Sequence, residues 1–348
     1  MARVTIRDVA RASGRSIATV SRVLNGQGSA SAQARAEVEA AAKSLGFRFN
    51  EVGRTLRSNR SRTIGVIVPT LTNPVFGEAV DGIEEVARTR NLQVLLSCVN
   101  YDPLREAEAI AMLASKQVGG LIMTVSDADN STAVAEARAL GLPFILIFNQ
   151  PSVPMPAVGV DNKAAGALVG EELIAHGHTH VAFIAGHFAA SDRSRQRFEG
   201  LTDTFVARGL PAPTLVEVDY RAPRHGGAVA KLLRQAPEVT ALFASNDMLA
   251  LSMVADLRAL GLSVPADMSV VGFDGISIGA MTDPALSTVV ASGGPMGRTA
   301  AARLADALEH PHAKALKDDF IRLPFQFRPG GSLAARAADK NRNVRSYP

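Results

Sequence analysis

Polar and aromatic side chains follow several short apolar segments of this chain, at the points where strands are expected to end. In open parallel sheets, ligands bind beyond the carboxyl ends of the strands, so side chains at these ends can meet in one site. Amides and carboxylates hydrogen-bond to vicinal hydroxyls, and an aromatic ring can lie against a sugar face. The sequence therefore predicts a polyol site. Its strand-end candidates are Asn149, Tyr220, Asn246 and Asp274.

Arg197 and Phe76 extend this candidate site. A guanidinium group can make a planar pair of hydrogen bonds, which suits two neighbouring polar atoms of a ligand. Phe76 lies one turn into a helix that Asn73-Pro74 is expected to open. Taken singly, an Asn or Asp after a strand is more often the cap of the next helix, so the prediction depends on the whole set.

The segment that carries Arg197 is rich in arginine. Arg193, Arg195 and Arg197 fall within five residues. Three guanidinium groups so close together favour an anionic ligand, such as a sugar acid or a sugar phosphate. The alternative is that Arg193 and Arg195 point to solvent, and the sequence leaves both possibilities open.

From residue 63 onward, short apolar segments alternate with amphipathic ones. The apolar segments predict buried parallel strands, and the helical patterns between them include 74–90, 103–115, 162–175 and 247–260. The segment from 63 to 328, about 265 residues, is too long for one such sheet, so two successive α/β subdomains are expected.

Residues 1–46 predict three short helices. Thr5 and Asp8 have the spacing of a capping box, and Ser13-Gly14 is expected to end the first helix. Ser16 can cap a second helix that ends at Asn25-Gly26, and a third helix follows Ser31, with Leu45 on its inner stripe. Two short helices joined by a glycine-containing turn form a helix-turn-helix.

The charge of the chain is divided unevenly. Residues 1–62 hold 12 Lys and Arg against 4 Asp and Glu, whereas residues 63–328 hold 21 against 28. A basic head on an acidic body indicates a polyanionic partner for the head, although a solvated basic face would give the same count.

Several classes of protein are not expected. No apolar run is long enough to span a membrane, and no secretion signal opens the chain, so a cytoplasmic protein without a membrane partner is predicted. The sequence lacks nucleotide-binding and hydrolase motifs, which argues against an enzyme and against a cofactor. His176, His178 and His180 alternate along the chain and are not expected to hold a metal, and Cys98 is expected to be a buried thiol.

Several ordered motifs resemble the lactose-repressor (LacI/GalR) family of bacterial transcription regulators. They run from residue 4 to about 328, and their most specific segments are 4–10 (VTIRDVA), 18–25 (ATVSRVLN), 64–69 (IGVIVP), 246–247 (ND), 271–274 (VGFD) and 284–289 (PALSTV). The resemblance implies a multidomain fold: an all-α helix-turn-helix head, a hinge helix, and an α/β core of two parallel-sheet subdomains resembling periplasmic sugar-binding proteins.

The resemblance also implies domain limits. The head spans 1–46, the hinge helix and linker span 47–62, and the effector-binding core spans 63–328. Within the core, the N-subdomain comprises 63–160 plus 292–322 and the C-subdomain comprises 163–289 plus 323–328. The tail, 329–348, lacks a leucine heptad and is expected to be disordered.

In a helix-turn-helix, the first turn of the second helix meets base edges in the major groove. Ser16, Ile17, Ala18 and Arg22 are therefore the candidates for base contacts, although Ile17 could instead pack in the core. Thr5, Thr19, Ser21 and Ser31 have hydroxyls suited to phosphate contacts. The resemblance adds Asn25 and the hinge residues Asn50, Arg54, Thr55 and Leu56, of which Leu56 is expected to wedge between base pairs in the minor groove.

The function implied by the resemblance is sequence-specific regulation of transcription. The expected partners are double-stranded operator DNA, a second copy of the chain, and a small effector such as a sugar, sugar acid or sugar phosphate. The expected effector contacts are Phe76, Asn149, Arg193, Arg197, Tyr220, Asn246 and Asp274. A regulator that requires a co-repressor, and a solute-binding protein for transport, are the alternatives.

Overall fold

The computed structural model describes residues 4–25, 30–47, 61–220, 222, 224–310 and 316–336. The chain divides into two compact units, residues 1–60 and 61–348. Among the described residues, no helix is long and apolar enough to cross a membrane.

The first unit is the predicted three-helix head, with α1 at Ile6–Ser13, α2 at Ile17–Asn25 and α3 at Ala32–Ser44. The backbone N–H and the hydroxyl of Thr5 both donate to the Asp8 carboxylate, and these bonds hold the pKa of Asp8 below its usual value. Gly14 ends α1 in the left-handed conformation. Val9, Val20 and Val38 are completely buried where the three helices meet.

The prediction that Leu45 lies on the inner stripe of the third helix was wrong. The helix ends at Ser44, and Leu45 caps it with 36% of its surface exposed. Gly46 then adopts a left-handed conformation, and the chain turns so that Phe47 packs against the head core instead.

The second unit contains two six-stranded sheets with helices on both faces, as the alternation of segments predicted. The first sheet has the order β11-β5-β4-β3-β1-β2 and the second has the order β12-β10-β9-β8-β6-β7. All pairs are parallel except β10 with β12. The strands are β1 Thr63–Val68, β2 Gln93–Cys98, β3 Gly120–Met123, β4 Phe144–Ile147, β5 Ala157–Gly159, β6 Val181–Gly186, β7 Thr214–Val218, β8 Ala241–Ala244, β9 Ser269–Asp274, β10 Ser287–Val290, β11 Phe320–Arg322 and β12 Gln326–Arg328.

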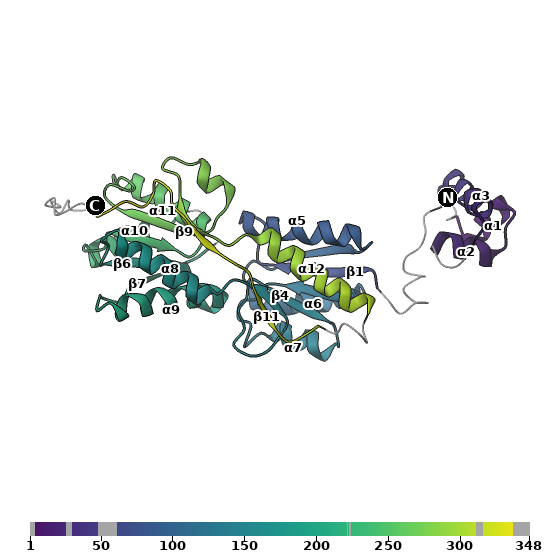
Figure 1. Cartoon of the computed structure of the whole chain (residues 1–348), viewed down its shortest axis with the longest axis horizontal. Coiled ribbons are helices and arrows are strands. Elements are labelled where there is room, and N and C mark those ends of the chain that lie inside the picture. The colour runs from purple at the N-terminus through teal and green to yellow at the C-terminus, as the bar shows by residue number, and fades with distance from the viewer. Residues whose placement is uncertain are drawn as a thin grey trace. The chain divides into compact units, whose positions relative to one another are not determined.

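The chain passes between the two sheets three times: between β5 and β6, between β10 and the helix that follows it, and between β11 and β12. That helix, α12, returns to the first sheet, where it packs along α5 and contacts β3, β4 and β5 (Figure 1). The helices of this unit are α5 Pro74–Thr89, α6 Pro103–Ser115, α7 Thr132–Ala139, α8 Asn162–Ala175, α9 Asp192–Ala207, α10 Gly226–Gln235, α11 Asp247–Ala259 and α12 Gly293–Glu309, with short 3-10 helices at Phe188–Ala190 and Ser277–Met281.

Close packing of α8 on α9 sets the position of Arg197. A side chain at Gly166 would collide with the backbone of Arg197, and one at Gly200 would collide with the backbone of Lys163. Because both glycines lack a Cβ atom, the two helices approach until their backbones touch. Arg197 is thereby held at the end of the second sheet, beside the strands that carry the predicted polar residues.

The tail was predicted to be disordered from residue 329, and this was wrong for residues 330–336. Ser332 is completely buried: its backbone exchanges hydrogen bonds with Val270 and Ala285, and its hydroxyl donates to the Val270 carbonyl at 2.6 Å. Nε2 of the buried His178 lies 3.1 Å from the Ala334 carbonyl. The segment satisfies backbone groups at the end of the second sheet, which composition alone does not reveal. Residues 337–348 lie outside the described residues.

Cys98 is exposed and not buried as predicted. It ends β2, which is the edge strand of the first sheet, and within that strand only Val94 and Ser97 are partly covered. An edge strand has only one neighbouring strand, so side chains that a central strand would bury stay exposed.

Candidate functional site

The first turn of α2 forms an exposed surface on the head. Ser16, Ile17 and Ala18 are exposed, and Ile17 keeps 48% of its surface accessible. The opposite face of the helix is buried through Val20 and Val23. The alternative that Ile17 packs in the head core is therefore wrong, because other residues already fill that core.

The remaining polar candidates of the head differ in their hydrogen bonds and in their exposure. Ser16 caps α2, since its hydroxyl accepts the Thr19 N–H, and Ser31 caps α3 by accepting the N–H of Ala34. Arg22 is exposed, and among the described residues the one hydrogen bond of its guanidinium runs from Nε to the Ala18 carbonyl at 3.4 Å. Thr5 and Ser31 are exposed, whereas Thr19 and Ser21 are half-buried. Asn25 ends α2 and its side chain is not described; Asn50, Arg54, Thr55 and Leu56 lie outside the described residues.

In the second unit, six of the seven predicted ligand residues line one small cavity between the two sheets. Its volume is about 30 Å³. The cavity also touches residues that the sequence did not single out, chiefly Asn73, Tyr101, Ser194 and Ser245. The six predicted residues are Phe76, Arg193, Arg197, Tyr220, Asn246 and Asp274. Tyr101 follows β2 and therefore obeys the same strand-end rule that identified the others.

Arg197 is the central cation of this cavity. Its Nε donates to Asn162 Oδ1 at 2.9 Å and its Nη1 donates to the Ser245 carbonyl at 2.6 Å. The guanidinium carbon lies 3.3 Å from the centre of the Phe273 ring, which adds a cation–π contact. Burial lowers the pKa of Arg197 to about 10, so the group remains charged at neutral pH. No described residue bonds Nη2, which leaves donors for a ligand.

Asp274 is the opposing anion, and the backbone around it is strained. Asp274 has φ +112° and Gly275 has φ +80°. The buried Asp247 holds this turn, because its carboxylate accepts the N–H groups of Gly275 and Ile276 at 2.8 Å and the Thr288 hydroxyl at 2.6 Å. Asp274 itself accepts from Asn73 at 2.9 Å, across the two halves of the core. Burial raises the pKa of Asp274 to about 6 and that of Asp247 to about 7.

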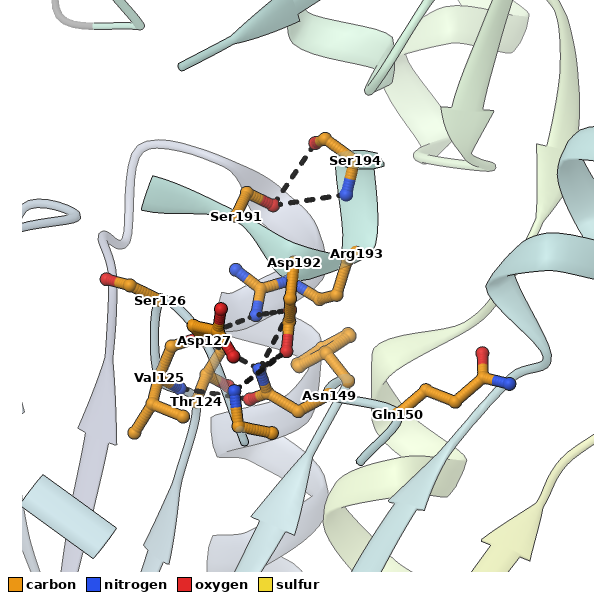
Figure 2. Close-up of polar contacts among 12 residues, drawn as sticks. Thr124, Val125, Ser126, Asp127, Asn149, Gln150, Ser191, Asp192, Arg193 and Ser194 are labelled. Atoms are coloured by element: carbon orange, nitrogen blue, oxygen red, sulfur yellow. Dashed lines mark hydrogen bonds and ion pairs between the residues drawn. The ribbon is translucent and has the colours of Figure 1, made fainter. Parts of the chain in front are cut away.

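Asn149 does not line the cavity, contrary to its predicted role. Figure 2 shows its amide between Asp192 and the backbone of Val125. Its Nδ2 donates to both Asp192 oxygens at 2.9 and 3.0 Å and to the Val125 carbonyl at 2.9 Å, and its Oδ1 accepts the Val125 N–H. The amide nitrogen and oxygen of Asn149 are therefore both bonded within the protein. One of the partners, Asp192, lies 43 residues further along the chain.

Asp192 joins the two halves of the core. It lies at the start of α9 on the second sheet, yet its carboxylate accepts from Asn149, which follows β4 of the first sheet (Figure 2). It also accepts the N–H of Ala128, which follows β3 of the first sheet. Arg193 pairs with the same carboxylate at 3.1 Å and donates to the Val125 carbonyl at 2.7 Å. We refer to Asn149, Asp192 and Arg193 as the cleft latch.

The pairing of Arg193 within the cleft latch weakens the case for an anionic ligand. The Arg193 charge is buried and already paired, so it does not point to solvent, but neither is it an uncompensated cation. Arg195 is half-buried, lies 3.6 Å from Asp127 and does not line the cavity. The three arginines therefore do not converge, and the argument for an anionic ligand loses its main support.

Comparison with known proteins identifies the class. The description "Bacterial regulatory proteins, lacI family" matches residues 5–50, and "Periplasmic binding proteins and sugar binding domain of LacI family" matches residues 61–323. The chain therefore belongs to the LacI family of DNA-binding transcriptional regulators, which are not enzymes, and the predicted resemblance is confirmed.

Individual relatives are similar over most of their length. The HTH-type transcriptional regulator GntR of Escherichia coli is 32% identical over 336 residues, covering 95% of this chain and 99% of the relative. The ribose operon repressor of Halalkalibacterium halodurans is 32% identical over 285 residues, covering 82% and 84%. A crystal structure of the lac repressor dimer bound to operator and the anti-inducer ONPF superimposes with a TM-score of 0.85 at 27% identity, covering 96% of this chain and all of the other.

The latch geometry predicts the effect of Asn149→Asp. The new carboxylate could not donate to Asp192 and would repel it, so the free energy of unfolding should fall by about 2–4 kcal/mol at pH 8. At pH 5 the loss should be smaller, because one proton shared by the pair restores a hydrogen bond. Urea unfolding at both pH values measures this.

A matched control for that variant is Asn130→Asp. Asn130 also donates to a carboxylate, that of Asp127 at 3.4 Å, but this pair is exposed. The control should change stability by less than about 1 kcal/mol. If Asn149→Asp and Asn130→Asp lowered the free energy of unfolding equally, the stabilising role of the cleft latch would be contradicted.

The cost of burying Asp274 predicts a stabilising substitution. Because its pKa is raised to about 6 in the folded protein, the contribution of Asp274 to the free energy of unfolding falls as the pH rises from about 4 to about 6. Asp274→Asn removes this cost and should be more stable than the wild type by up to about 3 kcal/mol at pH 7, with no gain near pH 4. Urea unfolding across this range tests the difference, with exposed Asp203→Asn as control. A gain that does not depend on pH would refute the assignment.

Proposed function

We propose that this protein represses a catabolic operon, binds a near-palindromic operator as a homodimer in the bacterial cytoplasm, and leaves the DNA when a small sugar or sugar-derived effector binds the core. The observation that carries the DNA-binding part is the exposed first turn of α2. An isoleucine with 48% of its surface accessible, on a head with a complete core, is available for apolar contact with a base.

Arg22 supports the same role. It lies on the exposed side of α2, and its guanidinium retains donors that can pair with guanine in the major groove. The hydroxyls of Thr5, Ser16, Thr19, Ser21 and Ser31 are suited to phosphate contacts that set the register. In the hinge segment, Asn50, Arg54, Thr55 and Leu56 are proposed minor-groove contacts, and Asn25 is a proposed contact at the end of α2.

The effector part rests on the cavity between Arg197 and Asp274. Among the described residues, no hydrogen bond engages Arg197 Nη2 or Asp274 Oδ1, and a sugar with vicinal hydroxyls can bridge two such groups. Asn246, Phe76 and Tyr220 complete the proposed contacts, with Arg193 at the edge of the site. Relatives include a transcriptional regulator solved with cellobiose and a LacI-family regulator solved with ribose.

Dimer formation rests on the exposed apolar residues of the core. Leu95 and Leu96 on the edge strand β2 are 38% and 37% exposed, and Leu71, Met248, Ile278 and Met281 are also exposed. An apolar edge strand favours association unless it is covered. A second copy of this chain is the proposed cover, since the lac repressor relative was solved as a dimer on its operator.

The test of DNA recognition starts by selecting binding sequences from a random duplex library with the full-length protein. The selected site should be near-palindromic, and Arg22→Ala or Ile17→Ala should each weaken binding by about 1–3 kcal/mol and relax base preference at one position per half-site. Fluorescence anisotropy at one fixed salt concentration measures both effects.

Lys43→Ala is the control for these variants, because Lys43 is exposed on α3 and not on α2. It should leave the selected bases unchanged. A library that returns no preferred sequence would contradict the proposal.

The test of effector control is Arg197→Ala. A thermal-shift screen of neutral sugars, sugar acids and sugar phosphates first identifies a ligand of the wild-type protein. The variant should lose the ligand-induced shift and the release of operator, yet keep operator binding without ligand. Arg195→Ala on the same helix should behave as the wild type, because Arg195 does not line the cavity. If the ligand instead strengthens operator binding, the protein depends on a co-repressor.

A further inference from the structure

A second and larger cavity lies beside the one between Arg197 and Asp274. Its volume is about 360 Å³, against about 30 Å³ for the inner cavity. The two cavities share Asn73, Tyr101, Tyr220 and Asn246 as lining residues. They are therefore neighbouring compartments with a common wall, and we call the larger one the outer cavity.

Two tyrosines form the aromatic part of this wall. The ring centres of Tyr101 and Tyr220 are 5.1 Å apart and their planes are tilted by 31°. Tyr220 is anchored, because its hydroxyl lies 2.5 Å from Ser245 Oγ and 3.2 Å from Ser194 Oγ. Among the described residues, nothing bonds the Tyr101 hydroxyl, so the ring of Tyr101 is the part of the wall that can move.

The backbone beneath Tyr101 is unusual. Asn100 has φ +52° and Tyr101 has φ +58°, so two consecutive residues other than glycine adopt the left-handed conformation. Such conformations cost free energy and persist at ligand sites where they aim a side chain. Here they direct the Tyr101 ring toward Tyr220 on the other half of the core.

The described lining of the outer cavity is mostly polar and aromatic. Apart from the shared residues, it is lined by Thr70, Thr72, Asn100, Ala222, His225, Met248, Leu249 and Ser252. None of the described lining residues is Arg, Lys, Asp or Glu. Burial lowers the pKa of His225, so this imidazole is neutral at pH 7. Hydroxyls, amides and aromatic faces of this kind recognise neutral sugars.

One hydroxyl of this lining lacks a partner. Ser252 Oγ is buried and makes no hydrogen bond to any described residue. A buried polar atom without a partner costs stability, and a ligand hydroxyl can satisfy it. A second such atom, Thr202 Oγ1 on α9, does not line either cavity and provides a comparison.

The sizes of the two cavities indicate how a ligand is divided between them. The inner cavity, as it stands, holds little more than a water molecule, while ligand sites commonly measure about 300–1,000 Å³. We propose that the outer cavity is a second subsite, which takes the second ring of an uncharged disaccharide or glycoside whose first ring binds between Arg197 and Asp274 after Tyr101 moves. This inference rests on the proposed effector control of the core.

Calorimetric titration of the full-length protein with matched sugars tests the proposal. The probes are glucose with cellobiose and maltose, galactose with lactose and melibiose, and xylose with xylobiose. For at least one set, the two-ring sugar should bind more than about tenfold more tightly than the single ring, because only it reaches the outer cavity. If no two-ring sugar binds more tightly than its single ring, the proposal is overturned.

Two substitutions at Ser252 link that difference to the outer cavity. Ser252→Leu fills the cavity and should abolish the advantage of the two-ring sugar while leaving the affinity for the single ring unchanged. Ser252→Ala should weaken the two-ring sugar by about 3- to 10-fold and keep or raise the thermal midpoint of the free protein. Thr202→Val also removes a buried unpartnered hydroxyl and should leave both affinities unchanged.

The outcomes separate this inference from the proposed function. Single sugars that release operator, together with no effect of Ser252→Leu on any sugar, would overturn the second subsite and retain effector control. Selective operator binding that no sugar alters would overturn effector control itself. Equal weakening of single-ring and two-ring sugars in Ser252→Leu would show a general loss of structure and would also count against the subsite.

Discussion

Burial of the Arg197 charge is the constraint on which the core cleft depends. A cation removed from water is tolerated only when hydrogen bonds and opposite charges replace its hydration. Part of this compensation comes from Asn162 at the start of α8, the carbonyl of Ser245 just after β8, and the ring of Phe273 in β9. The close approach of α8 and α9 at Gly166 and Gly200 sets the required position. Elements far apart in the chain must therefore assemble correctly before the charge is stabilised.

The buried carboxylates of the cleft are less well compensated than the Arg197 charge. Asp274 and Asp247 are both buried with raised pKa values, so their charged forms reduce the stability of the ligand-free core. The strained turn at Asp274 adds to this cost. A group held in a costly state but aimed into a cavity gains interactions when a ligand binds. The cleft latch acts differently, because Asp192 and Arg193 compensate each other and hold the two halves together without a ligand.

Sequence reasoning located most of the cleft and failed at particular residues. Tyr220, Asn246 and Asp274 follow from the positions of strand ends, and Phe76 follows from the helix that Asn73-Pro74 opens, both of which local patterns reveal. Asn149 satisfies the same rule, yet its amide is used by Asp192, which starts a helix 43 residues later. Tyr101 was not singled out, because the left-handed turn that aims it was not recognised. Residues 330–336 were wrongly expected to be disordered, because their partners lie on β9 and β10 rather than in the neighbouring sequence.

The sequence by itself determined the family, the three-helix head, the alternation of strands and helices, and the side of the sheets where polar residues gather. These properties depend on periodicity, caps and short motifs, which are local. Only the tertiary structure decided which polar side chains remain available to a ligand and which are used within the protein. It alone revealed the paired state of Arg193, the tyrosine wall and the outer cavity. Such features depend on distances between residues far apart in the chain, and hydrogen-bond partners compete for the same atoms until the fold selects among them.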